Sequence, residues 1–188
     1  MTTVVRENRM PRPIQSPRIG PTVIYALAVS LKRFQEEEDA VRKEFPWATR
    51  FAMGLPLAPW QRPLKWSAEQ CARFITSAWT GIHLGHYIVT DMALEEAMDV
   101  RHRPLSECVL DGQQRLHALE SYLTNQLAVP DARGGPTRWG DLDVVERRWF
   151  MNRHFSRGTV PLSSEAELRE LYNLMNFGGV AHEDSERA

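Results

Sequence analysis

The amino-acid sequence predicts a single α+β domain in which helices pack against a small mixed sheet. Apolar residues recur at helical spacing in several segments, and short apolar runs typical of strands lie between these segments. The 188-residue chain is 43% hydrophobic, which is enough to bury one good core. We therefore expect residues 21–188 to form one compact domain behind a basic arm at residues 1–20.

That arm is predicted from composition. Residues 1–20 hold four arginines and three prolines against a single acid, Glu7, so the segment is hard to fold locally. Two interpretations remain open, a flexible arm that contacts nucleic acid and a plain disordered tail.

An additional N-terminal helix is expected next. Gly20-Pro21 is typical of a helix start, apolar residues follow at helical spacing over 24–34, and the helix is expected to continue until Pro46. Residues 51–66 are rich in proline and predict an extended segment. Ser67 and Gln70 have the spacing of a capping box, which predicts a second helix that ends at Gly81.

The second half of the chain alternates strands and helices. Strands are expected over 86–90, 107–110, 147–155 and 159–162, and a helix over about 113–127. The segment 92–98 is ambiguous, and 130–142 is a loop rich in glycine and proline. Ser164 and Glu167 predict the cap of a last helix, whose expected core face is Leu168, Leu171, Leu174 and Met175.

The most informative segment is Cys108–Leu116, in which an apolar run leads into Asp111 and Gly112 and a helix then opens on Gln113, Gln114 and Arg115. The first turn of a helix has unpaired backbone N–H groups and a positive dipole end, so it attracts phosphate. Glycine lets the backbone approach a ligand closely, and arginine adds a forked cationic donor. Asp111 has the chemistry to hold a metal ion or accept a proton.

An alternative for this segment is purely structural. In it, Gly112 makes a turn before the helix and Asp111 is only the helix N-cap. The spacing of the residues leaves both interpretations open.

A second candidate segment is basic and aromatic. Arginines and aromatic rings interleave there in a way that suits phosphate contact and base stacking, although an edge strand protected by charge has the same pattern. The candidate nucleic-acid contacts are Arg147, Arg148, Trp149, Arg153 and His154. Trp60 is interpreted as a wall of a base pocket, and Trp66 as a core residue.

The composition of the chain limits which partners and which cellular location can be expected. The net charge of −1 excludes a uniformly basic coat for nucleic acid, and Cys71 and Cys108 lie in apolar contexts without a disulfide framework. We find no apolar run long enough to cross a membrane and no signal-peptide pattern. The expected location is the cytoplasm, that of the host if a phage encodes the protein.

Three segments together resemble a known family: Pro59–Trp66, Val109–Leu116 and Leu171–Gly179. They are similar to elements of the ParB/sulfiredoxin-like superfamily, in the branch with a DGQQR motif that forms the N-terminal domain of GmrSD-type modification-dependent restriction systems. The resemblance covers about residues 50–182. It implies a compact nucleotide-binding fold in which a strand, a glycine turn and a helix hold the phosphates.

The resemblance also implies roles for individual residues. Asp111, Gln114 and Arg115 would be catalytic, with Asp111 as metal ligand or base. Gly112, Gln113, Gln61, Arg62 and Asn176 would bind the nucleotide and its phosphates. The implied cofactors are a nucleoside triphosphate and Mg²⁺ or Mn²⁺.

The expected function is therefore nucleotide-dependent phosphoryl transfer in DNA modification or phage–host defence, as an NTP hydrolase or as a kinase of DNA or nucleosides. DNA is the expected macromolecular partner, and a partner protein or a homodimer is also considered. The alternatives are a non-catalytic DNA- or protein-binding module and a metal-dependent DNA nuclease. The C-terminal nuclease domain of the restriction systems is not expected here.

Overall fold

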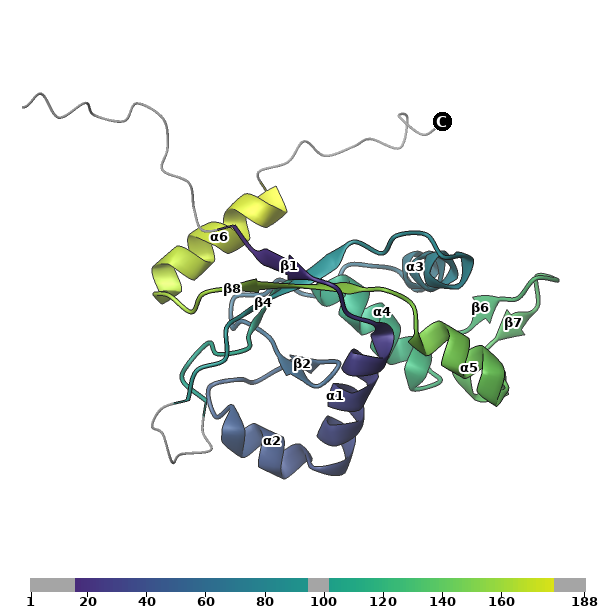
Figure 1. Ribbon diagram of the computed structural model, residues 1–188, viewed down its shortest axis with the longest axis horizontal. Helices are drawn as coiled ribbons and strands as arrows, with labels where there is room; N and C mark the ends of the chain where they lie inside the picture. The colour runs from purple at the N-terminus through teal and green to yellow at the C-terminus, as the bar shows by residue number, and fades with distance from the viewer. Residues whose placement is uncertain (1–15, 95–101, 178–188) are drawn as a thin grey trace, which may run out of the picture.

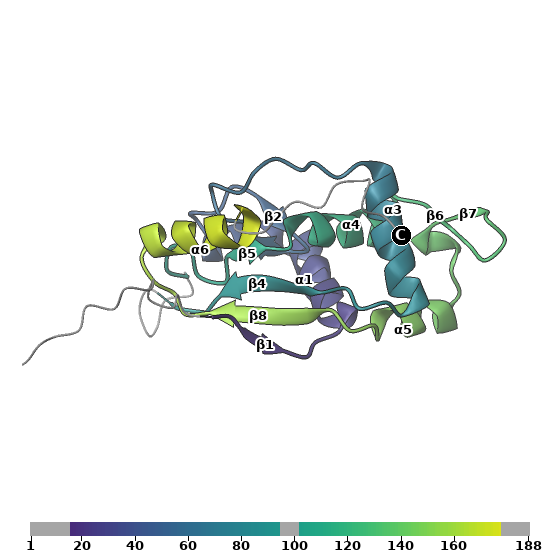
Figure 2. The ribbon, with the colours of Figure 1, turned by 90° about the horizontal axis from the view of Figure 1, so that it is seen from above.

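The computed structural model describes residues 16–94 and 102–177. Its centre is a mixed sheet of β1 (Arg18–Gly20), β4 (His86–Thr90), β5 (Val109–Asp111) and β8 (Ser156–Val160), in the spatial order β1-β8-β4-β5. β4 runs parallel to β8, whereas β1 with β8 and β4 with β5 are antiparallel. Figures 1 and 2 show this sheet with helices around it. The predicted α+β class is confirmed.

The two faces of the central sheet are covered by different apolar clusters, because successive side chains of a strand point to opposite faces. On β4, Tyr87 and Val89 pack into the larger cluster, while Ile88 between them packs into a smaller cluster beneath the last helix. The larger cluster includes buried residues of all the helices except the second and the last. Each fully buried leucine in it contributes about 1.5–3 kcal/mol.

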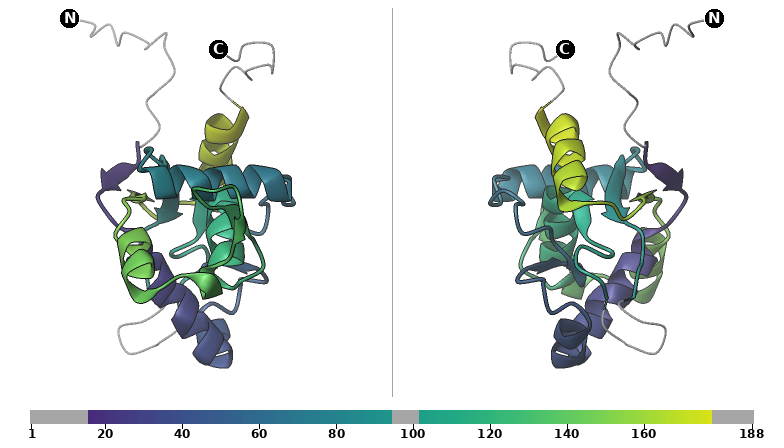
Figure 3. Two further views of the ribbon diagram at one scale, coloured as in Figure 1. Left: turned by 90° about the vertical axis from the view of Figure 1, so that its right-hand side faces the viewer. Right: turned by 90° about the vertical axis from the view of Figure 1, so that its left-hand side faces the viewer.

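Six α-helices are described: α1 (Ile24–Glu36), α2 (Glu38–Glu44), α3 (Ala68–Thr80), α4 (Gln113–Leu123), α5 (Val144–Met151) and α6 (Glu165–Phe177). Small antiparallel pairs are β2 (Phe51–Ala52) with β3 (Leu55–Pro56) and β6 (Val129–Pro130) with β7 (Pro136–Thr137), and a 3₁₀ turn spans Trp139–Asp141. As Figures 1 and 3 show, α6 lies on the side of the sheet away from α1 and α2. The predicted capping box of α3 is confirmed, since Ser67 Oγ accepts from Gln70 N and Gln70 Oε1 accepts from Ser67 N.

The N-terminal part of the chain differs from the prediction in two ways. Arg18–Gly20, the end of the expected arm, is the edge strand β1, paired with Thr159–Arg157 of β8; residues 1–15 lie outside the described residues. The expected long helix is broken at Glu37, where φ is −132° and ψ is 37°. This break lets Val41 and Phe45 of the α2 region form a separate small cluster with Ala48.

The expected strand over 147–155 is wrong, because α5 occupies most of it. Asp143 caps this helix, accepting hydrogen bonds from the N–H groups of Val145 and Glu146, and Glu146 completes the capping box. Local capping therefore prevails over the strand expected from the interleaved arginine and aromatic residues. The strand expected over 159–162 begins earlier, at Ser156.

Two smaller expectations about helices also change. α4 ends at Leu123 rather than near residue 127, because Asn125 adopts a left-handed conformation with φ of 64°. On α6, Leu168 is buried as expected, but Leu174 is 52% exposed and Tyr172 is buried in its place. The segment 95–98 and Gly178-Gly179 of the third motif lie outside the described residues.

Candidate phosphate-binding site

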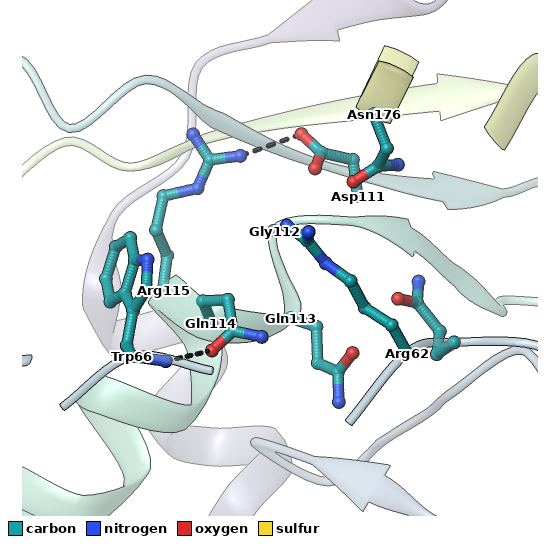
Figure 4. A pocket seen from close by; sticks show the side chains of 9 residues that line it. Arg62, Trp66, Asp111, Gly112, Gln113, Gln114, Arg115 and Asn176 are labelled. Atoms are coloured by element: carbon teal, nitrogen blue, oxygen red, sulfur yellow. Dashed lines mark hydrogen bonds and ion pairs between the residues drawn. The ribbon is translucent and has the colours of Figure 1, made fainter. Parts of the chain in front are cut away.

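The three segments that carry the motifs meet at one cavity. β5 leads into α4, the extended segment before α3 passes in front of the first turn of α4, and the C-terminal end of α6 completes the wall (Figure 4). The cavity has a volume of about 160 Å³. Its lining residues are Gln61, Arg62, Trp66, Asp111, Gly112, Gln113, Gln114, Arg115 and Asn176. All eight residues predicted to bind or transform a nucleotide are thus brought together, with Trp66 as an additional wall.

Gly112 forms the turn between β5 and α4. It is the N-cap residue of α4, in a left-handed conformation with φ of 97°, and the helix has no side-chain cap. A Cβ atom at this position would lie 2.7 Å from Cβ of Tyr87 in β4, so only glycine fits between strand and helix. The alternative in which Asp111 caps the helix is therefore wrong: no side chain of the described residues caps the first turn, whose residues Gln113 and Gln114 line the cavity.

Asp111 and Arg115 form an ion pair over the first turn of α4. Arg115 Nη2 donates to Asp111 Oδ2 at 2.7 Å, and both side chains are about one quarter exposed, at 25% and 27%. Both line the cavity, as Figure 4 shows. Asp111 is the only carboxylate among the described lining residues, so the guanidinium of Arg115 is available to an incoming anion once it leaves this partner.

The two glutamines that open α4 differ in what they contact. Gln114 Oε1 accepts hydrogen bonds from the backbone N–H groups of Lys65 and Trp66, at 3.0 and 3.1 Å, and so fixes the segment before α3. Its Nε2 is buried and has no partner among the described residues. Gln113 is only 6% exposed, and its Oε1 likewise lacks a described partner. Since a buried polar atom without a partner costs about 1–3 kcal/mol, both amides are suited to a polar ligand in the cavity.

Gln61 has a structural role that the sequence did not indicate. Its side chain is 7% exposed, and its Nε2 donates to the carbonyl groups of Val109 and Leu110 at 3.0 and 2.9 Å. It therefore ties the proline-rich segment to β5. Arg62, the next residue, extends its guanidinium toward the Gly112 turn (Figure 4) and forms no ion pair among the described residues.

The last wall comes from α6. Asn176 Nδ2 donates to the carbonyl group of Tyr172 at 2.9 Å, one turn back, and its side chain lies over Asp111 in Figure 4. The Tyr172 hydroxyl accepts a long, 3.5 Å hydrogen bond from the N–H group of Arg62. Tyr172 thus joins α6 to the Gln61-Arg62 segment, a role that its place in the third motif did not reveal.

The charges around the cavity favour an anion. Arg62 and Arg115 carry two positive charges against the single negative charge of Asp111, and the dipole of α4 adds its positive end. Within 16–94 and 102–177 there is no group of three or more His, Cys, Asp or Glu side chains arranged to hold a metal ion. The described residues are thus suited to a phosphate group, and to a divalent ion only when phosphate oxygens complete its coordination.

The core role expected of Trp66 is confirmed, whereas the base-pocket role expected of Trp60 is wrong. Trp66 lines the cavity, although it also packs against the larger core cluster. Trp60 does not line it, because the guanidinium of Arg169 covers its ring at 4.4 Å. Trp60 therefore serves the packing of α6 rather than a base pocket.

The basic and aromatic candidates on and after α5 do not contribute to the cavity. Arg153 lies 3.2 Å above the ring of Trp149, which stacks on Trp79 with centroids 5.6 Å apart. Arg147 donates to the carbonyl group of Gly140 at 2.9 Å, whereas Arg148 and His154 are exposed. Two of the four basic side chains thus have packing partners, and DNA contact by this segment stays a prediction.

Comparisons with protein-family models, curated proteins and solved structures find no match for this chain. The resemblance to the ParB/sulfiredoxin-like superfamily therefore stays a prediction. No helix in the described part of the chain is long and apolar enough to cross a membrane.

Proposed function

We propose that this protein binds the phosphate chain of a nucleoside triphosphate at the N-terminus of α4 and catalyses phosphoryl transfer. One observation carries the proposal: an uncapped helix N-terminus, two arginines and Gln114, whose buried Nε2 has no partner among the described residues, converge on one cavity. Backbone N–H groups, amides and arginines are the donors that phosphate oxygens accept from.

The size of the cavity supports binding of phosphate groups rather than of a whole nucleotide. A volume of about 160 Å³ is roughly five times the share of one water molecule in the liquid, and it lies below the range of about 300–1,000 Å³ of sites that enclose drug-sized ligands. We therefore place the phosphate chain inside and the nucleoside at the mouth, beside Trp66.

The chemistry would rest on charge neutralisation and positioning, which dominate phosphoryl transfer. Arg115 and Arg62 would stabilise the charge that develops on the transferred group. When Arg115 turns to the phosphate, the carboxylate of Asp111 is released, and it can then accept a proton from the attacking hydroxyl or water. Mg²⁺ accepts one carboxylate together with phosphate oxygens, so Asp111 would hold this ion with the nucleotide bound, where it would neutralise phosphate charge.

The test is binding of each nucleoside triphosphate and release of phosphate, with Mg²⁺, by wild type and Arg115→Ala. The matched control is Arg73→Ala, because Arg73 forms an ion pair of the same spacing with Glu69 at 2.8 Å on α3, outside the cavity. We expect Arg115→Ala to weaken binding by about tenfold or more and to abolish turnover, since each bond to a charged group contributes about 1.5–3 kcal/mol. Arg73→Ala should match wild type.

The acceptor of the phosphoryl group is identified by repeating the assay with DNA that carries modified bases. Label transferred to DNA would identify a kinase, and free phosphate alone a hydrolase. Nucleotide binding without turnover would refute the proposed catalysis and would support a protein that only binds nucleotide. Absence of binding by the wild-type protein would refute the whole proposal.

A further inference from the structure

A second hollow, distant in sequence from the motif residues, lies between α1 and α5. Its volume is about 700 Å³, and it shares no lining residue with the cavity at α4. We call it the α1–α5 groove. It is lined by Val23, Tyr25, Ala28, Val29, Lys32, Trp139, Val144, Arg147, Arg148, Met151 and Asn152. Figure 1 and the left view of Figure 3 show the two helices next to each other.

The groove exposes apolar side chains that the fold leaves uncovered. α1 buries Ile24, Leu27 and Leu31 in the core and turns Tyr25 and Val29 outward, 61% and 50% exposed. Val144 at the start of α5 is 79% exposed. Single exposed apolar residues are ordinary, but several that line one concave surface indicate an interaction site.

The charges of the groove have one sign. Among the residues that the structure describes, Lys32, Arg147 and Arg148 line the groove, and no aspartate or glutamate does. The nearby carboxylate of Glu146 is engaged in the capping box of α5, and Lys32 contacts Glu36 only at 3.7 Å. An apolar floor with a basic rim is complementary to a ligand that has an apolar face and acidic flanks.

We propose that the α1–α5 groove binds an acidic amphipathic helix of a partner protein. A groove between two helices accepts a third helix through apolar side chains at i, i+3, i+4 and i+7. Most apolar lining residues are aliphatic, which suits aliphatic side chains better than stacked nucleobases. A concave surface does not fit a flat membrane, and a second copy of this chain would set Lys32 and Arg148 against their own equivalents across a two-fold axis.

The experiment selects peptides of about four helical turns from a random display library, with the full chain as bait. The double variant Val29→Glu, Val144→Glu serves as counter-bait. Both side chains are at least half exposed, so the variant is expected to fold, which circular dichroism and thermal unfolding verify. We expect peptides retained by wild type and lost on the variant to be acidic, with apolar residues at helical spacing.

Synthetic versions of the enriched peptides then give affinities. We expect the double variant to weaken binding by about tenfold or more, and Arg148→Glu to weaken it by several-fold and to reduce its salt dependence. Ile82→Glu is the control, because Ile82 is 61% exposed and lies outside the groove.

Three results would overturn the proposal. They are enriched peptides that are neutral or basic, no peptide that distinguishes wild type from the double variant, and equal loss of binding on Ile82→Glu. Binding of single-stranded DNA or of anionic lipid vesicles that depends on Val29 and Val144 would assign the groove to those ligands instead. None of these outcomes depends on nucleotide binding at α4.

Discussion

The carboxylate of Asp111 and the guanidinium of Arg115 are joined by a 2.7 Å hydrogen bond over the first turn of α4, inside the cavity that we assign to phosphate. The protein thus holds its own anion where the ligand would bind. In the proposed function, a phosphate group would compete with Asp111 for Arg115, and this competition would link the two residues.

Asp111→Asn should separate binding from catalysis. Removal of the carboxylate frees Arg115 and deletes a negative charge from the cavity, so we expect the affinities for phosphate and for nucleotide, both measured without Mg²⁺, to rise by up to about fivefold, the equivalent of about 1 kcal/mol for a partly exposed pair. Phosphate release should fall to background, because the proton acceptor is lost. Isothermal titration calorimetry and a phosphate-release assay measure the two effects.

The control for this variant is Glu69→Gln, which removes the partner of Arg73 on α3 and should leave both readings unchanged. Weaker nucleotide binding by Asp111→Asn in the absence of Mg²⁺ would contradict the competition between the carboxylate and the phosphate. Unchanged turnover would exclude Asp111 as the base.

Gly112→Ala should destabilise the fold as well as close the site. The new methyl group would lie 2.7 Å from Cβ of Tyr87, and φ of 97° strains any residue with a Cβ, so we expect a loss of about 2–3 kcal/mol in the free energy of unfolding. Urea unfolding followed by tryptophan fluorescence measures it. Gly134→Ala, also at positive φ but with no atom within 4 Å of the added Cβ, separates backbone strain from the clash and should cost clearly less.

Gln61→Leu tests the structural role that the geometry gives this residue. The substitution leaves the carbonyl groups of Val109 and Leu110 without their shared donor, and we expect a loss of about 1–3 kcal/mol of stability. Nucleotide affinity measured well below the unfolding transition should change less than it does in Arg62→Ala. A variant that keeps wild-type stability but loses binding would return Gln61 to the ligand contacts.

Both cysteines should be unreactive in the folded protein. Burial raises the pKa of the Cys71 and Cys108 thiols, and Cys108 is completely inaccessible. Because the thiolate is the reactive form, a raised pKa keeps both groups protonated and inert at pH 8. Iodoacetamide labelling followed by mass spectrometry should show no adduct under native conditions and two in denaturant. Rapid native labelling of Cys108 would indicate that the sheet opens at β5.

The strand, turn and helix around Gly112 could be predicted from the sequence because their signals are local. An apolar strand, a glycine and a helix that opens on amides and an arginine specify one short unit, and the structure places Gly112 in the turn that this unit requires. The α3 capping box is local in the same sense.

Roles that depend on long-range contacts could not be predicted. Gln61 bonds to carbonyl groups of β5, Gln114 to the segment before α3, and Arg169 of α6 covers Trp60; no spacing rule connects these residues. The error at 147–155 has a different origin. The capping signal of Asp143 and Glu146 is local and present in the sequence, and it determines a helix in spite of the interleaved arginine and aromatic residues.

The parallel pairing of β4 with β8 limits the order in which segments of the chain can assemble into the fold. All of α4 and α5 must be synthesised before β8 can align, and α6, which carries Asn176, follows still later. Contacts between such distant segments close slowly, since a large loop entropy is lost before they form. During synthesis the nascent chain would therefore display the Gly112 turn long before Asn176 reaches it, so that the complete binding site is a late product of folding.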